Sequence, residues 1–170
     1  SLMVWGNPVE LNANQQRKQR MREQLLKNRR ILSAYDLRPE DAPEYIRFIN
    51  SYRPEYLYGY ATALTALAHI LEPHRDQLRV KLKAVVSTSE TLSPEQAALF
   101  SRVFGCPAAN EYGARDAGIL GYSCPCGGLH ITAENCILET LDPVTYEPVP
   151  AGQGGVLAIT GLTNHVQPRL

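Results

Sequence analysis

The sequence predicts an α/β fold, with a mostly parallel sheet flanked by helices and then an antiparallel β portion. Three observations support this. Short apolar runs alternate with helix-like stretches between residues 31 and 111. The links between them are short, which is typical of successive βα units in a parallel sheet. Beyond residue 122, strand-like runs follow one another with Pro- and Gly-rich turns between them, which indicates antiparallel pairing.

The first third of the chain gives a helix, a strand and a second helix. Residues 12–30 are polar and rich in good helix formers, and residues 31–35 read as a short strand. Apolar side chains at Tyr45, Ile46, Phe48 and Ile49 then have the spacing of an amphipathic helix. Pro54 ends this helix, because the residue before a proline is disfavoured in the helical conformation.

Three strands and two helices follow in alternation. Residues 55–60 predict a strand, residues 61–71 an Ala- and Leu-rich helix, and residues 82–87 the next strand. Ser93, Pro94 and Glu95 supply an N-cap, a proline at the first helical position and an early acid. They predict a helix that runs to about Phe104. Residues 107–111 form the strand after it.

The pattern changes in the last third. Residues 129–132 and 136–141 read as two strands of a hairpin around the sequence A-E-N, and residues 156–160 as a further strand. We therefore expect a parallel subdomain over residues 1–122 and an antiparallel portion over residues 123–170, together one domain.

Composition excludes several classes of protein. Lys plus Arg number 17 and Asp plus Glu 17, so near-zero net charge argues against a dedicated nucleic-acid or membrane-surface binder. No apolar run approaches the roughly 20 residues of a spanning helix, and the opening S-L-M-V-W is too short for a signal peptide. Four cysteines do not form a dense disulfide pattern. A cytoplasmic enzyme fits best.

Residues 110–118, N-E-Y-G-A-R-D-A-G, read as a strand end that opens into a loop. In open α/β sheets, ligands bind outside the carboxyl ends of the strands. Tyr112 offers a flat ring, Gly113 allows close backbone approach, and Asp116 could hold a metal ion attached to a phosphate. The alternative is plain turn chemistry, since a Tyr-Gly pair is common in turns.

Four further segments surround this one: K-A-V-V-S-T-S-E-T-L at 83–92, G-L-H-I at 128–131, I-L-E-T-L-D-P at 137–143 and G-G-V-L-A-I-T-G-L at 154–162. In that order and spacing they resemble the adenylate-forming (ANL) superfamily, in particular its phenylacetate-CoA ligase branch with CapK-like relatives. The resemblance implies ATP-dependent, Mg²⁺-assisted activation of a small carboxylic acid as acyl-AMP, followed by thioester formation with coenzyme A.

The resemblance also implies site residues. The nucleotide-binding positions are Thr88, Ser89, Glu90, Glu111, Tyr112, Gly113, Ala114 and Asp116. Thr88 and Ser89 stand where the family favours glycine, and Asp116 where it has Glu. Tyr58, Gly59 and Tyr60 are candidates to line the acid pocket, or else are core residues. No nucleophile motif is present, and no catalytic residue is assigned, which suits adenylation, where binding and charge stabilisation carry most of the catalysis.

A second pattern concerns metal. Cys124, Cys126, His130 and Cys136 form C-x-C-x3-H-x5-C, and thiolates with imidazole at short spacing suit tetrahedral Zn²⁺. The alternative is two loop cysteines, a strand histidine and a buried Cys136. A zinc-stabilised interaction domain without catalysis is therefore the competing function. A third reading is an adenylate-forming protein of capsule or cofactor biosynthesis that does not use coenzyme A.

The resemblance implies more chain than these 170 residues hold. A phosphate loop, a ribose-binding segment and a lid with its lysine have no counterpart here. We therefore expect an internal piece of a ligase that does not complete adenylation alone. Apolar surface that is internal in the parent protein would then be exposed, and two copies of the chain could pair through it as a homodimer.

Overall fold

The computed structural model describes residues 1–6, 13–163, 165 and 168–169 of the chain. These form two compact units, Ser1–Asn110 and Glu111–Leu170. The division falls earlier than the predicted change at residue 122. The first residue of the predicted opening helix, Asn12, lies outside the described residues.

Four parallel strands form the sheet of the first unit. They are β1 (Leu2–Trp5), β2 (Arg30–Ser33), β3 (Tyr56–Tyr60) and β4 (Ala84–Thr88), with β1 between β2 and β3, and β4 beyond β3. The fifth strand, β5 (Ala108–Ala114), begins in this unit, and just before it the Val85 amide donates to the Pro107 carbonyl at 3.0 Å. The strand order of the whole sheet is β2-β1-β3-β4-β5-β6-β7. The predicted fold class is confirmed, and β1 is a strand that the sequence did not indicate.

Helices α1 (Ala13–Leu26), α2 (Ala42–Tyr52), α3 (Ala61–Leu71) and α4 (Pro94–Phe104) connect these strands, with short 3-10 helices at Pro39–Asp41 and Glu72–Gln77. Ser93 is the N-cap of α4, as predicted, and its Oγ accepts from the Gln96 amide at 3.2 Å. The structure adds a reciprocal bond from the Ser93 amide to Gln96 Oε1 at 2.9 Å. Gly105, at φ +66°, ends the helix. The bounds of α3 match the predicted ones, and α2 ends just before Arg53-Pro54, as expected.

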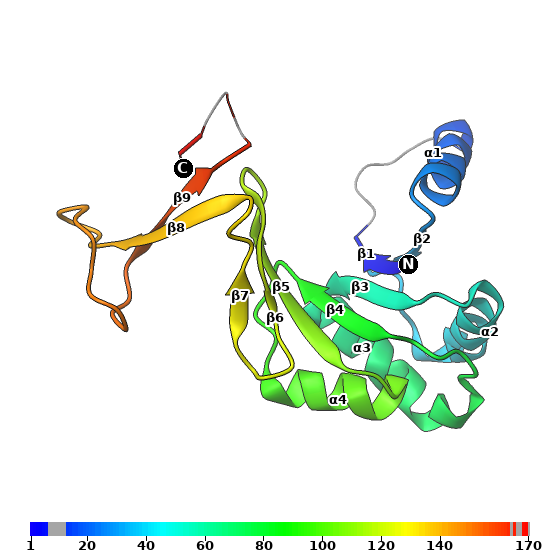
Figure 1. Ribbon diagram of the computed structural model, residues 1–170. Coiled ribbons are helices and arrows are strands. Elements are labelled where there is room, and N and C mark those ends of the chain that lie inside the picture. The colour runs from blue at the N-terminus through cyan, green and yellow to red at the C-terminus, as the bar shows by residue number, and fades with distance from the viewer. Residues whose placement is uncertain (7–12, 164, 166–167, 170) are drawn as a thin grey trace. The chain divides into compact units, whose positions relative to one another are not determined.

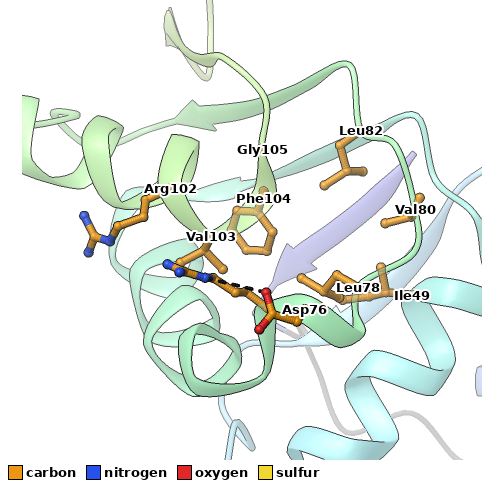
Figure 2. Close-up of a pocket in the computed structure, with 10 residues that line it drawn as sticks. Ile49, Asp76, Leu78, Val80, Leu82, Arg102, Val103, Phe104 and Gly105 are labelled. Carbon is orange, nitrogen blue, oxygen red and sulfur yellow. Dashed lines mark ion pairs between the residues drawn. The ribbon is translucent and has the colours of Figure 1, made fainter.

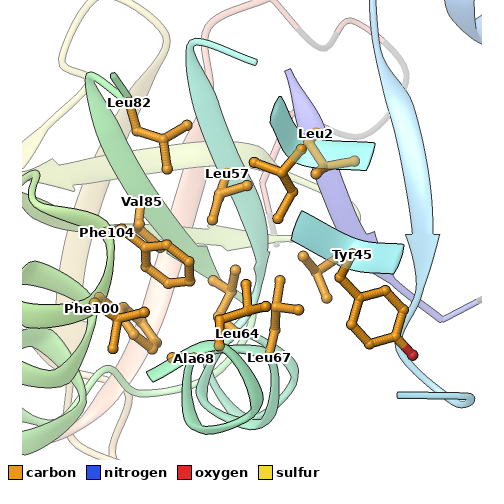
Figure 3. Close-up of a cluster of buried hydrophobic side chains, with 14 of the residues drawn as sticks. Leu2, Tyr45, Leu57, Leu64, Leu67, Ala68, Leu82, Val85, Phe100 and Phe104 are labelled. Carbon is orange, nitrogen blue, oxygen red and sulfur yellow. The ribbon is translucent and has the colours of Figure 1, made fainter. Parts of the chain in front are cut away.

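The core of the first unit lies between the sheet and the helices α2, α3 and α4, which cover one face of β1, β3 and β4 (Figure 1). Leu2, Leu57 and Val85 point from the strands into this core, where they meet Leu64 and Phe100 (Figure 3). All five are fully buried. At about 25 cal/mol per Å² of buried apolar surface, this cluster is the main source of the unit's stability.

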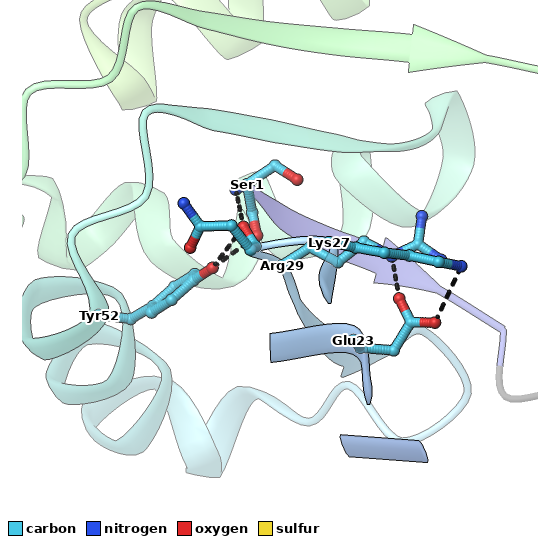
Figure 4. Close-up of polar contacts among 6 residues, drawn as sticks. Ser1, Glu23, Lys27, Arg29 and Tyr52 are labelled. Atoms are coloured by element: carbon cyan, nitrogen blue, oxygen red, sulfur yellow. Dashed lines mark hydrogen bonds and ion pairs between the residues drawn. The ribbon is translucent and has the colours of Figure 1, made fainter. Parts of the chain in front are cut away.

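Polar contacts fix the beginning of the chain to this unit (Figure 4). The Ser1 ammonium donates to the Asn28 carbonyl at 2.9 Å, and the Tyr52 hydroxyl donates to the Ser1 carbonyl at 3.0 Å. Burial raises the pKa of Tyr52. Nearby, the Glu23 carboxylate accepts a hydrogen bond from Arg29 and pairs with Lys27 at 3.1 Å. Strand β1 is thereby held beside the segment that leaves α1.

The second unit is antiparallel. Strand β5 pairs with β6 (Gly118–Ser123), β6 pairs with β7 (Leu129–Ile131), and β8 (Cys136–Leu141) pairs with β9 (Val156–Gly161). The predicted hairpin between residues 129–132 and 136–141 is therefore wrong. Each of its two strands has another partner, and for β8 this is a ladder of six residue pairs with β9.

The error arose because β6 was not recognised. Two of its six residues, Gly118 and Gly121, are glycines, which are depleted in strands. At Gly121 the glycine is required by packing, because a Cβ there would lie 2.7 Å from the His130 carbonyl oxygen of the neighbouring strand. Within the described ranges, no helix has both the length and the apolar character needed to cross a bilayer.

Candidate functional site

The carboxyl ends of the adjacent parallel strands β1, β3 and β4 carry a cluster of aromatic and small polar residues in the first unit. Trp5 stacks on Tyr60 with ring centroids 4.1 Å apart, and on Tyr58 at 6.1 Å. Tyr60 is paired in register with Thr88 at the end of β4. Because side chains alternate along a strand, Tyr58 and Tyr60 alternate with the buried residues Leu57 and Gly59, and Tyr60 also packs against the helical core. We call Trp5, Tyr58 and Tyr60 the aromatic cluster.

Gly59 sets the spacing beneath this cluster. It pairs with Val4 of β1, and a Cβ at this position would lie only 2.4 Å from the Val4 carbonyl oxygen. Gly59 is buried, so its side of the strand faces the interior. The lack of a side chain at this position allows β1 to lie close to β3. Tyr58 and Tyr60 are half-buried. The structure thus brings together two of the three residues proposed for acid binding, and adds Trp5.

The turn after β4 contains the predicted residues Thr88, Ser89 and Glu90. Thr88 is buried and Ser89 has a left-handed backbone at φ +64°, which is uncommon for a residue other than glycine. Glu90 is exposed, and both of its carboxylate oxygens are occupied by Thr62. Oε2 accepts from the Thr62 amide at 2.8 Å and Oε1 from the Thr62 hydroxyl at 3.0 Å. The turn is therefore joined to the start of α3.

The segment around Tyr112 belongs to the second unit and is a β-hairpin. Strand β5 continues past the predicted strand end at residue 111, with a bulge between Tyr112 and Gly113. A Cβ at Gly113 would lie 2.7 Å from the Gly118 carbonyl oxygen, so glycine is needed for this close pairing. Ala114 ends the strand, and Asp116 lies in the loop that follows.

The Tyr112 ring is available to a ligand, since 42% of the residue is exposed. Glu111, by contrast, is 7% exposed and is paired in register with Tyr122 of the neighbouring strand. Burial and the Glu111 carboxylate together raise the pKa of Tyr122. The hairpin thus presents an aromatic face at Tyr112, while the side chain of Glu111 is engaged in the hairpin itself.

The four predicted zinc ligands do not come together. Cys136 is 3% exposed, packs with Leu120 and Ile159 in the core of the second unit, and donates from Sγ to the Thr132 carbonyl at 3.5 Å. Across the described part of the chain, no group of three or more His, Cys, Asp or Glu side chains is placed to hold a metal ion. The assignment of Cys136 as a zinc ligand is corrected, because the thiol serves as a small apolar core group.

The other three residues of that set lie near the surface. Cys124 and Cys126 flank Pro125 in a turn, where the Cys124 amide donates to the Gly128 carbonyl at 2.8 Å, and His130 is exposed on β7. Hydrogen bonds from the backbone of Gly128 and Cys126 lower the pKa of the Cys124 thiol. Its thiolate form is therefore favoured relative to an ordinary cysteine.

A separate hollow of about 300 Å³ opens elsewhere in the first unit (Figure 2). Its floor is apolar, with Leu78, Leu82 and Phe104, and its rim carries Arg102 and the Arg75–Asp76 ion pair at 3.9 Å. Arg102 is bound by Glu72 at 2.7 Å. None of the residues predicted for nucleotide, acid or metal binding lines this hollow.

Trp5 is the residue that sequence reasoning missed. It is the only tryptophan of the chain, and it follows a short apolar run, Leu2 to Val4, that is buried in the sheet. That run was the available indication. It was too short to identify as a strand without knowledge of its two neighbours, β2 and β3.

No known protein-family profile matches the chain. Over 89 residues the chain is 28% identical to the protein CapK of Staphylococcus aureus. The matched segment covers 52% of this chain and 20% of CapK. Among solved structures, the anthranilate CoA ligase AuaEII, in complex with anthranoyl-AMP, superposes with a TM-score of 0.60 at 20% identity. The match covers 78% of this chain and 26% of that enzyme.

Two further structures agree with this. The luciferase-like enzyme of the mealworm Zophobas morio has a TM-score of 0.66 at 14% identity, over 94% of this chain and 39% of that one. A benzoate CoA ligase of Burkholderia xenovorans LB400 has a TM-score of 0.57 at 20% identity, over 81% and 30%. The chain thus spans well under half the length of the proteins it matches. It has the fold of a part of these coenzyme A ligases and of the luciferase-like enzyme.

Proposed function

We propose that the chain supplies nucleotide- and acid-contacting surface of an ATP-dependent ligase that converts a carboxylic acid to acyl-AMP and then to a coenzyme A thioester. One observation carries the proposal: the aromatic cluster and the Thr88–Glu90 turn lie together at the carboxyl ends of β1, β3 and β4. This is the edge of an open α/β sheet at which ligands bind.

The roles follow from the chemistry of each group. The small residues Thr88 and Ser89 allow the backbone of the turn to approach a nucleotide. Tyr112 is exposed and offers its ring for stacking on adenine, with Gly113 and Ala114 beside the acyl phosphate. Asp116 supplies a carboxylate of the hard-oxygen type that Mg²⁺ prefers. A Mg²⁺ ion held by Asp116 would neutralise negative charge on the phosphate groups of the nucleotide.

The acid is proposed to be aromatic. Tyr58 and Tyr60, with Trp5 stacked on them, form a group of near-parallel rings that a phenyl or similar ring could extend, with a gain from both burial and stacking. Phenylacetate, benzoate and anthranilate are suitable probes. The AuaEII and B. xenovorans enzymes, which share the fold, act on aromatic acids, and this supports the choice.

Ligand binding tests the proposal directly. Because a ligand that binds only the folded chain stabilises it by RT ln(1 + [L]/Kd), AMP should raise the melting temperature in a concentration-dependent way. Phenylacetate should add to the shift, and Mg²⁺ should matter only with ATP. Adding coenzyme A to the AMP and acid mixture then tests whether the chain binds coenzyme A, which would appear as a further rise in melting temperature.

A matched pair of variants locates the nucleotide. Tyr112→Leu should reduce the AMP-induced shift, whereas Tyr56→Leu should leave it unchanged, since Tyr112 and Tyr56 are similarly exposed at 42% and 40%. Loss of stacking on one base corresponds to about 1–3 kcal/mol, or roughly 5- to 150-fold in Kd. No response to millimolar AMP in the unaltered chain, together with tight zinc binding, would instead favour a zinc-stabilised interaction domain.

A further inference from the structure

We propose that Glu90 is a positioning residue: its carboxylate fixes the Thr88–Glu90 turn to the first turn of α3 and does not itself contact the nucleotide or its metal ion. The inference rests on the proposed function only for the identity of the ligand, a nucleotide. The contact itself does not depend on that proposal, because both oxygens of Glu90 are hydrogen-bonded to Thr62, at 2.8 Å and 3.0 Å, across 28 positions of the sequence.

The start of α3 explains why a carboxylate is needed there. The helix begins at Ala61 directly after β3, and its N-cap residue, Tyr60, makes no side-chain capping bond. First-turn amides have no partner within their own helix, and negative charge near them is favoured by the helix dipole. Glu90 thus caps α3 from the turn after the neighbouring strand β4, as an Asp or Ser at the N-cap position would do from the helix's own end.

The contact also holds the turn in its unusual shape. Ser89 lies at φ +64°, a conformation that a serine adopts only when its surroundings impose it. Glu90 follows directly, and its attachment to Thr62 restrains the backbone on one side of Ser89. On the other side, Thr88 is buried and paired in register with Tyr60.

The same contact reaches the aromatic cluster. Thr62 is two residues after Tyr60, which stacks on Trp5 at 4.1 Å. A shift of the first turn of α3 would therefore move Tyr60 relative to Trp5. The turn that would meet the nucleotide and the surface that would meet the acid are coupled through one carboxylate, and we infer that Glu90 keeps the two in register.

The chain provides its own reporter for this coupling. Trp5 is the single tryptophan, so tryptophan emission reports the Trp5–Tyr60 stack without any ligand. Glu90→Ala should change the emission spectrum and speed hydrogen exchange at the Thr62 amide. Glu90→Gln should leave both close to the unaltered chain, because the amide oxygen still accepts from the Thr62 N–H and the amide nitrogen still reaches its hydroxyl. Glu134→Ala, which removes an exposed carboxylate from the other compact unit, is the control.

Nucleotide binding separates positioning from direct contact. If Glu90 positions the turn, Glu90→Ala weakens AMP binding by about 3- to 30-fold, the range of a lost helix cap, and Thr62→Val weakens it by less. The double variant should then match Glu90→Ala, since both changes remove one interaction. Glu90→Gln should stay within about twofold of the unaltered chain, because it keeps both contacts to Thr62 and loses only the attraction of an exposed charge to the helix N-terminus.

Two results would overturn the inference. The first is an unchanged Trp5 emission and an unchanged Thr62 exchange rate in Glu90→Ala. The second is a Glu90→Gln chain that binds AMP as weakly as Glu90→Ala while its emission and exchange stay normal, which would mean that the charge acts on the ligand. Failure of the unaltered chain to bind AMP would count against the proposed function only, because the emission and exchange measurements need no nucleotide.

Discussion

Trp5 and Tyr60 stack with ring centroids 4.1 Å apart and an angle of 24° between their planes, although 55 positions of sequence separate them. The contact exists because Val4 and Gly59, the residues just before them, are paired in parallel strands. It marks the edge of the sheet at which we place the acid.

The stack should contribute to stability. We expect Tyr60→Leu to lower the free energy of unfolding by about 1 kcal/mol beyond the loss of buried area, which is typical of aromatic pairs, and to alter Trp5 emission. Tyr58→Leu should have a smaller effect, because its ring lies 6.1 Å from that of Trp5. Tyr56→Leu is the control, since Tyr56 contacts Lys83. Urea denaturation followed by fluorescence measures all three, and equal effects at the three positions would contradict the assignment.

Gly59 should tolerate no side chain. In Gly59→Ala the new Cβ would lie 2.4 Å from the Val4 carbonyl oxygen, a backbone atom held in the strand ladder. We expect a loss of about 1–3 kcal/mol, as for other overpacked positions. Gly154→Ala is the matched control, because the space around that position is open. Comparison of the urea midpoints decides the point, and a Gly59→Ala chain as stable as Gly154→Ala would refute the close-approach argument.

Glu23 should make stability depend on acid pH. Its hydrogen bond with Arg29 holds the pKa of the carboxyl below its ordinary value, against the opposing effect of burial. A carboxyl whose pKa is lower in the folded chain stabilises it above the pKa of the unfolded state, and this contribution disappears as pH falls through the folded pKa. Glu23→Gln should therefore reduce the loss of stability between about pH 5 and pH 3.

The size of this effect at neutral pH should be about 1.5–3 kcal/mol, the usual value for a hydrogen bond to a charged group. Urea midpoints measured from pH 7 to pH 3 in both chains test it. Parallel pH profiles for Glu23→Gln and the unaltered chain would show that the pair contributes nothing to folding.

Two cysteines should differ sharply in reactivity. Backbone hydrogen bonds lower the pKa of Cys124, whereas burial raises the pKa of Cys106. Because the thiolate is the nucleophile, Cys124 should be alkylated by iodoacetamide well before Cys106 at pH 7 in the folded chain. Peptide mass spectrometry after timed quenching gives both rates. In urea the difference should vanish, and a difference that persisted there would point to local sequence and not to the fold.

Local chemistry alone determined several elements. Ser93, Pro94 and Glu95 lie within three positions of each other and predicted the start of α4, which the structure has at Pro94 with Ser93 as N-cap. The alternation of strands and helices likewise predicted the parallel sheet. Short-range patterns carry this information because capping, turns and amphipathic periodicity all act within one or two helical turns.

Strand partners and contacts between distant segments were decided only by the tertiary structure. The choice of β9 over residues 129–132 as the partner of β8, the burial of Cys136 against Leu120 and Ile159, and the bond between Glu90 and Thr62 all join residues that the sequence keeps apart. Which of several compatible partners a strand or a carboxylate takes depends on where the rest of the chain has packed. A pattern confined to neighbouring residues does not contain that information.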